Sequence, residues 1–87
     1  MAKVIIYTKD YCSFCLGAKA LLRSKEVEFE EIDITRDVTL QEEVQRLSGR
    51  RTVPQIFIDS RPIGGFEELR QLDLTGELDC LLGLGVS

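Results

Sequence analysis

The order of apolar segments at the start of the chain limits the fold more than any other feature. Residues 3–7 form an apolar run rich in β-branched residues, which predicts a strand covered on both faces. A short polar loop follows. From Ser13 to about Lys25, apolar residues recur at helical spacing. A strand that leads so directly into an amphipathic helix is typical of an α/β protein.

The middle of the chain predicts a second strand and a second helix. Residues 27–34 read as a strand, although the apolar phase shifts halfway along it, which indicates a bulge or a strand end. Apolar positions between residues 40 and 47 mark a helix, with Thr39 and Glu42 at the spacing of a capping box and Gly49 as its stop. The order strand, helix, strand predicts a parallel strand pair.

The last third of the chain predicts a hairpin followed by helices. Residues 55–58 form a third strand, and a turn leads into a short fourth strand that Pro62 confines to an edge of a mixed sheet. After the glycine pair at 64–65, two helical segments follow, separated by a break at Thr75-Gly76. The final residues, 83–87, are expected to fray.

Composition narrows the functional classes. The 87 residues, 44% hydrophobic and 30% charged, are expected to form a single globular domain, 1–87. The net charge of −4, with basic residues interspersed among acids, argues against a nucleic-acid partner. The first apolar run is too short for a signal peptide, and no stretch is long enough to span a bilayer. A cytoplasmic protein without a membrane partner is therefore expected.

The cysteine and histidine counts restrict the chemistry further. Three cysteines, an odd number, make a structural disulfide framework improbable, and a reducing cytosol favours free thiols. The chain has no histidine, which removes Cys-His nucleophile pairs, His-ligated zinc and an imidazole base. Any disulfide here is therefore expected to be transient and catalytic.

Cys12 and Cys15 form a Cys-x-x-Cys motif, which occurs in metal sites, in haem attachment and in redox enzymes. Zinc sites usually need four ligands, and only Cys80 remains as another thiol. Haem attachment needs histidine next, and residue 16 is leucine. A copper-chaperone loop would carry methionine where Asp10 stands. A redox pair is the interpretation that the context favours, and no metal is expected.

The start of a helix distinguishes the two thiols. Unpaired N–H groups and the positive end of the helix dipole favour a thiolate at Cys12, and Lys9 in the same loop adds a positive charge. We therefore predict Cys12 as the attacking sulfur. Cys15 lies one turn further into the helix and is expected to be more buried, so that it closes a disulfide with Cys12.

Three separate motifs together resemble the glutaredoxin family. They are Tyr7-Thr8-Lys9-Asp10-Tyr11-Cys12-Ser13-Phe14-Cys15, Thr52-Val53-Pro54-Gln55-Ile56-Phe57-Ile58 and Ile63-Gly64-Gly65-Phe66-Glu67-Glu68-Leu69. The resemblance covers nearly the whole chain. It implies a thioredoxin-like fold with a four-stranded mixed β-sheet flanked by α-helices, in the order βαβαββα with an extra short C-terminal helix.

The same resemblance implies a glutathione site. Pro54 would be a cis-proline facing the cysteines, and the backbone of Val53 would pair with glutathione as a short added strand. Gly65 would let the next helix present N–H groups to the γ-glutamyl carboxylate, and Glu67 would meet the amine. The glycyl carboxylate would be met by Lys9, Gln41 and Arg51. The remaining residues implied to contact glutathione are Tyr11, Phe14, Thr52 and Phe66.

The implied activity is glutathione-dependent reduction of protein–glutathione mixed disulfides and of protein disulfides, with glutathione as co-substrate. The implied partners are glutathionylated or disulfide-containing proteins and reductases that need thiol recycling, and a monomer is expected. Cys80, in the last leucine-rich segment, is interpreted as a small core residue rather than a second redox centre.

Two alternatives stay open. The family's commonest motif has Pro-Tyr between the cysteines, whereas this chain has Ser13-Phe14, and serine there sometimes accompanies a [2Fe–2S] cluster shared by two subunits. A dimeric cluster carrier or sensor is therefore one alternative. The other is a thioredoxin-like protein served by a flavin reductase, although the Trp-Cys-Gly-Pro-Cys motif typical of thioredoxins is absent.

Overall fold

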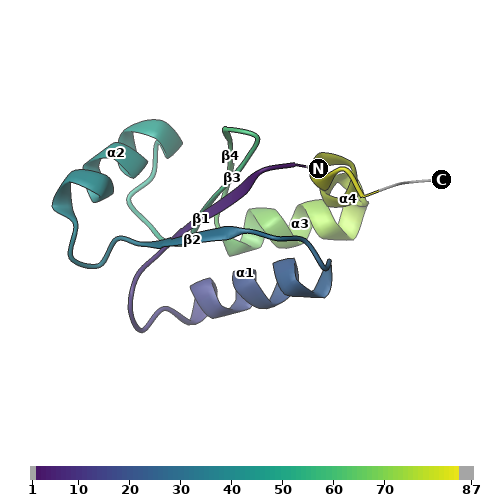
Figure 1. The fold of residues 1–87 in the computed structure, drawn as a ribbon, viewed down its shortest axis with the longest axis horizontal. Helices are drawn as coiled ribbons and strands as arrows, with labels where there is room; N and C mark the ends of the chain where they lie inside the picture. Colours follow the sequence, from purple (N-terminus) through teal and green to yellow (C-terminus); the bar gives the residue numbers. More distant parts are fainter. Residues whose placement is uncertain (1, 85–87) are drawn as a thin grey trace.

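The computed structural model describes residues 2–84 and contains a four-stranded mixed sheet in the order β2-β1-β3-β4 (Figure 1). Strand β1 (Val4–Thr8) pairs in parallel with β2 (Glu30–Asp33) and antiparallel with β3 (Gln55–Ile58). Strand β3 forms a hairpin with β4 (Arg61–Gly64), which lies at the sheet edge. The predicted mixed sheet and the edge position of the strand that contains Pro62 are confirmed.

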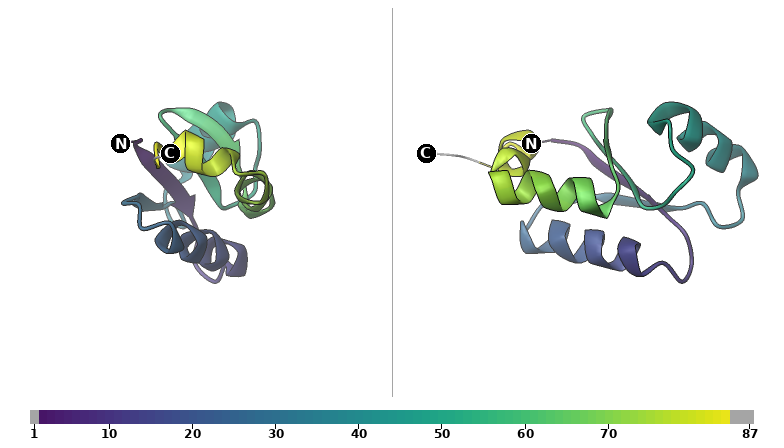
Figure 2. Two further views of the ribbon diagram at one scale, coloured as in Figure 1. Left: turned by 90° about the vertical axis from the view of Figure 1, so that its right-hand side faces the viewer. Right: turned by 180° about the vertical axis from the view of Figure 1, so that it is seen from behind.

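Four helices flank the sheet: α1 (Ser13–Ser24), α2 (Val38–Ser48), α3 (Phe66–Thr75) and α4 (Glu77–Leu82). Helices α1 and α3 lie side by side on one face of the sheet, and α2 lies on the other side (Figures 1 and 2). The element order is the expected βαβαββα with one additional short helix. None of the helices between residues 2 and 84 is long and apolar enough to cross a membrane.

The hydrophobic core lies between the sheet and the layer formed by α1, α3 and α4. Ile6, Leu22, Ile56, Leu69 and Leu78 are each fully buried in it. Burial of one such side chain stabilises the fold by roughly 2 kcal/mol. Alternation along β1 places one row of its side chains in this core and the other row on the side of α2.

The second row of β1 is less covered than the sequence predicts. Val4, Ile6 and Thr8 are buried, whereas Ile5 and Tyr7 are only half-buried. The Tyr7 ring packs edge-on against Phe57, with ring centroids 5.6 Å apart. The expectation of a strand covered on both faces is therefore wrong for the second face, because α2 alone lies on that side of the sheet.

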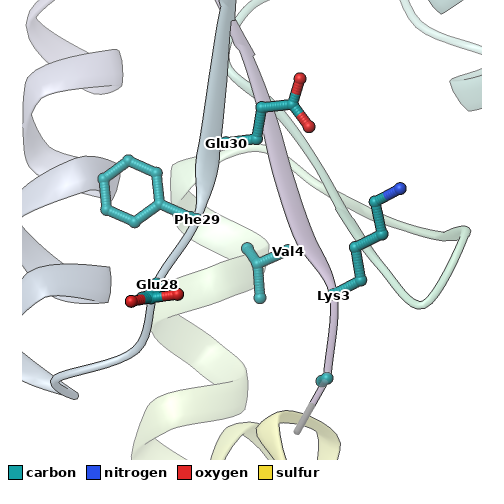
Figure 3. A pocket seen from close by; sticks show the side chains of 6 residues that line it. Lys3, Val4, Glu28, Phe29 and Glu30 are labelled. Carbon is teal, nitrogen blue, oxygen red and sulfur yellow. The ribbon is translucent and has the colours of Figure 1, made fainter.

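Strand β2 is shorter than predicted, because it begins at Glu30 rather than at residue 27. The parallel ladder runs from Ile5 opposite Glu30 to Thr8 opposite Asp33. Before this ladder begins, the segments that lead into β1 and β2 diverge around a hollow lined by Lys3, Val4 and residues 28–30 (Figure 3). The phase shift in the sequence thus marks a strand end, and not a bulge.

Helix ends follow side-chain and glycine caps. Asp37 is the N-cap of α2, and its carboxylate accepts a 2.9 Å hydrogen bond from the N–H of Leu40. The predicted capping box at Thr39 is therefore wrong, since an aspartate two residues earlier already satisfies the first turn. Gly49 ends the helix in the left-handed conformation, as predicted. The predicted fraying falls mainly on residues 85–87, which lie outside the described part.

Cys80 is exposed, so its interpretation as a core residue is wrong. Helix α4 buries Leu78 and Leu82, which are four residues apart and share one face. Cys80 lies halfway between them and therefore points to the opposite face. The leucine pattern correctly predicted a helix with one apolar face, but the prediction placed Cys80 on the wrong face of that helix.

Candidate active site

Cys12 is the N-cap residue of α1, with an extended backbone at the end of the loop that follows β1. Its Sγ accepts a hydrogen bond of 3.2 Å from the backbone N–H of Cys15. The sulfur therefore occupies the place that a serine or aspartate oxygen takes at an ordinary N-cap. The Cys12 sulfur therefore lies at the free N–H groups of the first turn and at the positive end of the helix dipole.

Cys15 differs from Cys12 in its surroundings. Its side chain is buried with 2% exposure, whereas Cys12 is half-buried. Burial, reinforced by the hydrogen bond with Cys12, raises the pKa of the Cys15 thiol to about 12. The structure thus gives one accessible sulfur at a helix terminus and one sequestered sulfur beside it.

The loop before β3 faces the accessible sulfur. The Cys12 thiol lies 3.7 Å from the carbonyl oxygen of Val53, to which it donates a hydrogen bond. The Val53–Pro54 peptide bond is cis, as the family resemblance implied. Within residues 2–84, no atom accepts a hydrogen bond from the N–H of Val53. A backbone edge with an unpaired donor therefore lies next to the reactive thiol.

A cleft of about 250 Å³ begins at this loop. Five of the predicted site residues line it: Lys9, Gln41, Arg51, Thr52 and Val53. The side chain of Gln41 is held by hydrogen bonds from its Nε2 to the carbonyl oxygens of Ile34 (2.7 Å) and Thr35 (3.2 Å). The structure thus brings two cationic side chains and an amide together on one side of the Val53 backbone.

The start of α3 also lies near the cysteines, and one of the backbone N–H groups there is already hydrogen-bonded. The N–H of Gly65 donates a 2.7 Å hydrogen bond to Oε1 of Glu68, and Arg50 contacts the same oxygen at 2.8 Å. The N–H groups of Phe66 and Glu67 have no acceptor in the described chain. The N–H donors left for an anion are therefore those of Phe66 and Glu67, rather than that of Gly65.

Aromatic and apolar side chains surround the cysteines. Tyr11 is fully exposed and has a positive φ of 57°, and Phe14 is 59% exposed. The rings of Phe14 and Phe66 lie 6.4 Å apart and join the start of α1 to the start of α3. Glu67 is exposed and pairs with Arg70 at 3.0 Å. Of the predicted residues, Tyr11 is thus fully exposed, whereas Glu67 is exposed but held by a neighbour on its own helix.

Two ion pairs near the site were not predicted from the sequence. Glu68 pairs with Arg50 beside Val53, and Lys19 pairs with Glu31 behind the cysteines. The signal for Glu68 was its place three residues after Gly65, which is the spacing of a capping box. The partnership of Lys19 with Glu31 had no local signal, because it depends on how α1 packs against β2.

Comparisons with known proteins agree with this geometry. The family model described as Glutaredoxin matches residues 4–63. Glutaredoxin 3 of Escherichia coli (strain K12) is 54% identical over 82 residues, which cover 94% of this chain and 99% of the relative. The glutaredoxin of Pseudomonas aeruginosa is 43% identical over 82 residues, 94% of this chain and 98% of the relative.

Solved structures agree as well. The solution structure of glutaredoxin from Brucella melitensis has a TM-score of 0.86 at 48% identity and covers all of this chain and 95% of its own. The crystal structure of a buckwheat glutaredoxin–glutathione complex has a TM-score of 0.87 at 25% identity and covers 94% of this chain and 77% of its own. The fold is therefore the thioredoxin-like fold of these proteins. The protein is a thiol–disulfide oxidoreductase, and the chain belongs to the glutaredoxin family.

Proposed function

We propose that the protein uses glutathione to reduce protein–glutathione mixed disulfides and protein disulfides through Cys12 and Cys15. The observation that carries the proposal is the arrangement of an N-cap thiol, the unpaired N–H of Val53 and the cleft lined by Lys9 and Arg51. It is also supported by the buckwheat relative, whose crystal structure is that of a glutathione complex.

The first branch needs Cys12 alone. The Cys12 thiolate attacks the glutathionyl sulfur of a mixed disulfide, a new S–S bond forms, and the protein thiolate leaves and takes up a proton. A second glutathione thiolate then attacks the glutathionyl sulfur on Cys12. This releases oxidised glutathione and restores the Cys12 thiolate. One free glutathione is consumed for each mixed disulfide reduced, because the other half of the oxidised glutathione comes from the substrate.

The second branch needs both cysteines. Cys12 attacks a protein disulfide and forms a mixed disulfide with the substrate, and Cys15 then attacks the Sγ of Cys12. The substrate leaves as a dithiol and the enzyme is left with a Cys12–Cys15 disulfide, which two glutathione molecules reduce. Glutathionylated proteins, disulfide-containing proteins and reductases that need thiol recycling are the proposed partners.

The proposed binding of glutathione uses its peptide-like backbone. The N–H and C=O of Val53 pair with it as a short strand addition, which recognises an extended peptide without reading its side chains. Lys9, Gln41 and Arg51 line one cleft, which we assign to one carboxylate. The first-turn N–H groups of α3 meet the other, and Glu67 meets the amine. Thr52, Phe14, Tyr11 and Phe66 complete the contact surface. A monomer in the cytoplasm remains a prediction.

The test is a glutathione-coupled assay of mixed-disulfide reduction with wild type, Cys12→Ser and Cys15→Ser. Cys12→Ser is expected to abolish turnover, because no other thiol lies at a helix terminus beside Val53. Cys15→Ser is expected to retain it, since the first branch does not use Cys15. Turnover that survives in Cys12→Ser would sink the assignment of the attacking sulfur.

The same preparation tests the two alternatives from the sequence. A brown dimer after anaerobic purification would support the [2Fe–2S] carrier to which Ser13 points. Reduction by a flavin reductase with NADPH and without glutathione would support the thioredoxin-like alternative. A colourless monomer that turns over only with glutathione is the outcome that we expect.

A further inference from the structure

A second cleft, of about 550 Å³, opens beside the cysteines and contains an ion pair that the two branches above do not use. Cys12, Cys15, Lys19 and Glu31 all line it. Lys19 lies four residues after Cys15 on α1, so the two side chains share one face of the helix. Side chains at this spacing start from Cβ atoms about 6 Å apart. The positive charge of Lys19 thus acts on the buried Cys15 thiol and lowers its pKa, against the larger effect of burial.

The cation is held firmly. Nζ of Lys19 lies 3.0 Å from Oε2 and 3.2 Å from Oε1 of Glu31. The buried hydroxyl of Thr8 donates a further hydrogen bond of 2.8 Å to Oε2. The side chain of Lys19 is only 15% exposed, so this pair is more sequestered than an ordinary surface ion pair. The anchor comes from two strands, β1 and β2, while the cation comes from α1.

The carboxylate acts here as an anchor rather than as a base. The hydrogen bonds from Lys19 and Thr8 hold the pKa of Glu31 below its ordinary value. Glu31 is therefore ionised at neutral pH and has no tendency to take a proton from Cys15. The pair therefore fixes the position of the Lys19 ammonium in the cleft that Cys15 also lines.

Cys15 is the group that needs such a charge. It is buried, which disfavours its thiolate, yet the dithiol branch requires that thiolate twice. It must form before Cys15 attacks Cys12, and it forms again when glutathione breaks the Cys12–Cys15 disulfide. The mixed-disulfide branch never requires it.

We propose that Lys19, positioned by Glu31 and Thr8, stabilises the Cys15 thiolate and thereby serves the dithiol branch selectively. In the attack, the Cys15 proton passes to water in the cleft, the Cys12–Cys15 bond forms and the bond from Cys12 to the substrate sulfur breaks. The electron pair leaves with the substrate thiolate, which takes a proton from water. The cysteine pair is oxidised by two electrons and the substrate disulfide is reduced by two. The inference rests on the proposed function.

Other titratable groups face the same cleft. They are Lys9, Asp10 and Tyr11 on the loop and Asp33 on β2. Asp33 is tied to the N–H of Thr35 at 2.8 Å, and Thr35 in turn accepts from the N–H of Asp10. Lys9 also lines the cleft beside Val53, so its loss is expected to affect both branches. Lys19 does not line that cleft, which makes it the discriminating position.

The experiment compares Lys19→Met, Lys19→Arg and the matched control Arg23→Gln. Arg23 lies on the same helix, one turn further on, with its guanidinium 5.7 Å from the ring of Phe29. Each variant reduces two probes with glutathione: a peptide with one internal disulfide, and a glutathionylated peptide. Lys19→Met is expected to lower the ratio of the two rates about tenfold, the effect of one pKa unit. Lys19→Arg and Arg23→Gln keep the wild-type ratio.

A second readout isolates the resolving step. Each variant is glutathionylated on Cys12, and the release of glutathione by attack of Cys15 is followed from pH 7 to 10. In Lys19→Met the rise of the rate is expected about one unit higher in pH than in wild type. A merely structural role would lower the rates on both probes, which the ratio in the first readout detects. If Lys19→Met fails to fold, Glu31→Gln carries the test, with a smaller shift in the same direction.

The outcomes separate the inference from the proposed function. Equal losses on both probes, or an unchanged ratio and pH profile, would overturn the role of Lys19 while leaving glutathione-dependent turnover intact. A wild-type enzyme that reduces neither probe with glutathione would overturn the proposed function itself.

Discussion

The backbone N–H of Cys15 donates a 3.2 Å hydrogen bond to the Sγ of Cys12, so one helical turn fixes both sulfurs. This bond satisfies one of the free N–H groups of the helix terminus. The same turn carries Cys15 into the core, where its thiol is 2% exposed. The division between an accessible and a sequestered thiol therefore arises from the geometry of a helix start.

The raised pKa of Cys15 predicts how stability depends on pH. The fold holds this pKa at about 12, above the ordinary value of 9.0 that applies when the chain is unfolded. The associated stability is present in full below about pH 9 and is lost as the pH rises towards 12, because only the unfolded state then releases the proton. Between pH 7 and 10, reduced wild type should lose about 1 kcal/mol more unfolding free energy than Cys15→Ala.

Urea unfolding under reducing conditions measures this difference, and Cys80→Ala is the matched control. Cys80 is exposed, so removing it should leave the pH dependence of wild type unchanged. If the unfolding free energies of wild type and Cys15→Ala changed in parallel with pH, the claim that burial raises the pKa of the Cys15 thiol would be wrong.

Local pattern was enough to predict most of the fold and the redox pair. The apolar run of β1, the edge position of Pro62 and the Cys-x-x-Cys at a helix start all depend on neighbours in sequence. The errors have a common physical origin in packing. The extent of β2 depends on where it parts from β1, and the exposure of Cys80 depends on which face of α4 meets the core. Likewise, nothing near Lys19 in the sequence identifies Glu31 as its partner.

The position of Lys9 predicts a defect in glutathione use. Lys9 lines the cleft beside Val53 and also the cleft beside the cysteines. Lys9→Ala should raise the KM for glutathione several-fold, because a carboxylate loses one of its cations, and the KM should become less sensitive to salt. Lys3→Ala is the control, since Lys3 lines the hollow at the other end of β1 (Figure 3). An equal rise of KM in both variants would point to net charge instead.

The carboxylate of Glu68 should stabilise the start of α3. It accepts from the N–H of Gly65 at 2.7 Å and from Arg50 at 2.8 Å, and these bonds lower its pKa. Glu68→Ala is expected to lower the unfolding free energy by about 1 kcal/mol, as for loss of a helix cap. Glu68→Gln keeps an oxygen acceptor and should lose less.

The lowered pKa of Glu68 also predicts how its contribution to stability changes with pH. Because the folded pKa of Glu68 lies below its ordinary value of 4.5, its charge-dependent stabilisation is present above that pH and is lost as the pH falls. The difference between wild type and Glu68→Gln should therefore shrink on acidification. A difference that grows towards low pH would exclude the charged hydrogen bonds as its cause.

Gly64 and Gly76 offer a matched test of how α3 is joined to the sheet. Both have positive φ, 115° and 85° respectively, so an alanine at either position pays a backbone cost of about 1 kcal/mol. A Cβ on Gly76 would meet nothing within 4 Å, whereas one on Gly64 would lie 2.9 Å from both Cγ and Oε1 of Glu68. Gly64→Ala should therefore be the more destabilising change, by roughly a further 1 kcal/mol or more.

The additional cost at residue 64 comes from a side chain, so it should be reversible. In Gly64→Ala, the further change Glu68→Ala removes the two closest contacts, at 2.9 Å, and leaves only the Cβ of residue 68 at 3.1 Å. The two substitutions together should therefore cost less than the sum of their separate effects. The same Glu68→Ala change combined with Gly76→Ala should be additive, because a Cβ on Gly76 reaches no other side chain. Thermal unfolding of the three single and two double variants, together with wild type, measures both couplings. Additivity at both glycines would show that backbone conformation alone selects glycine at position 64.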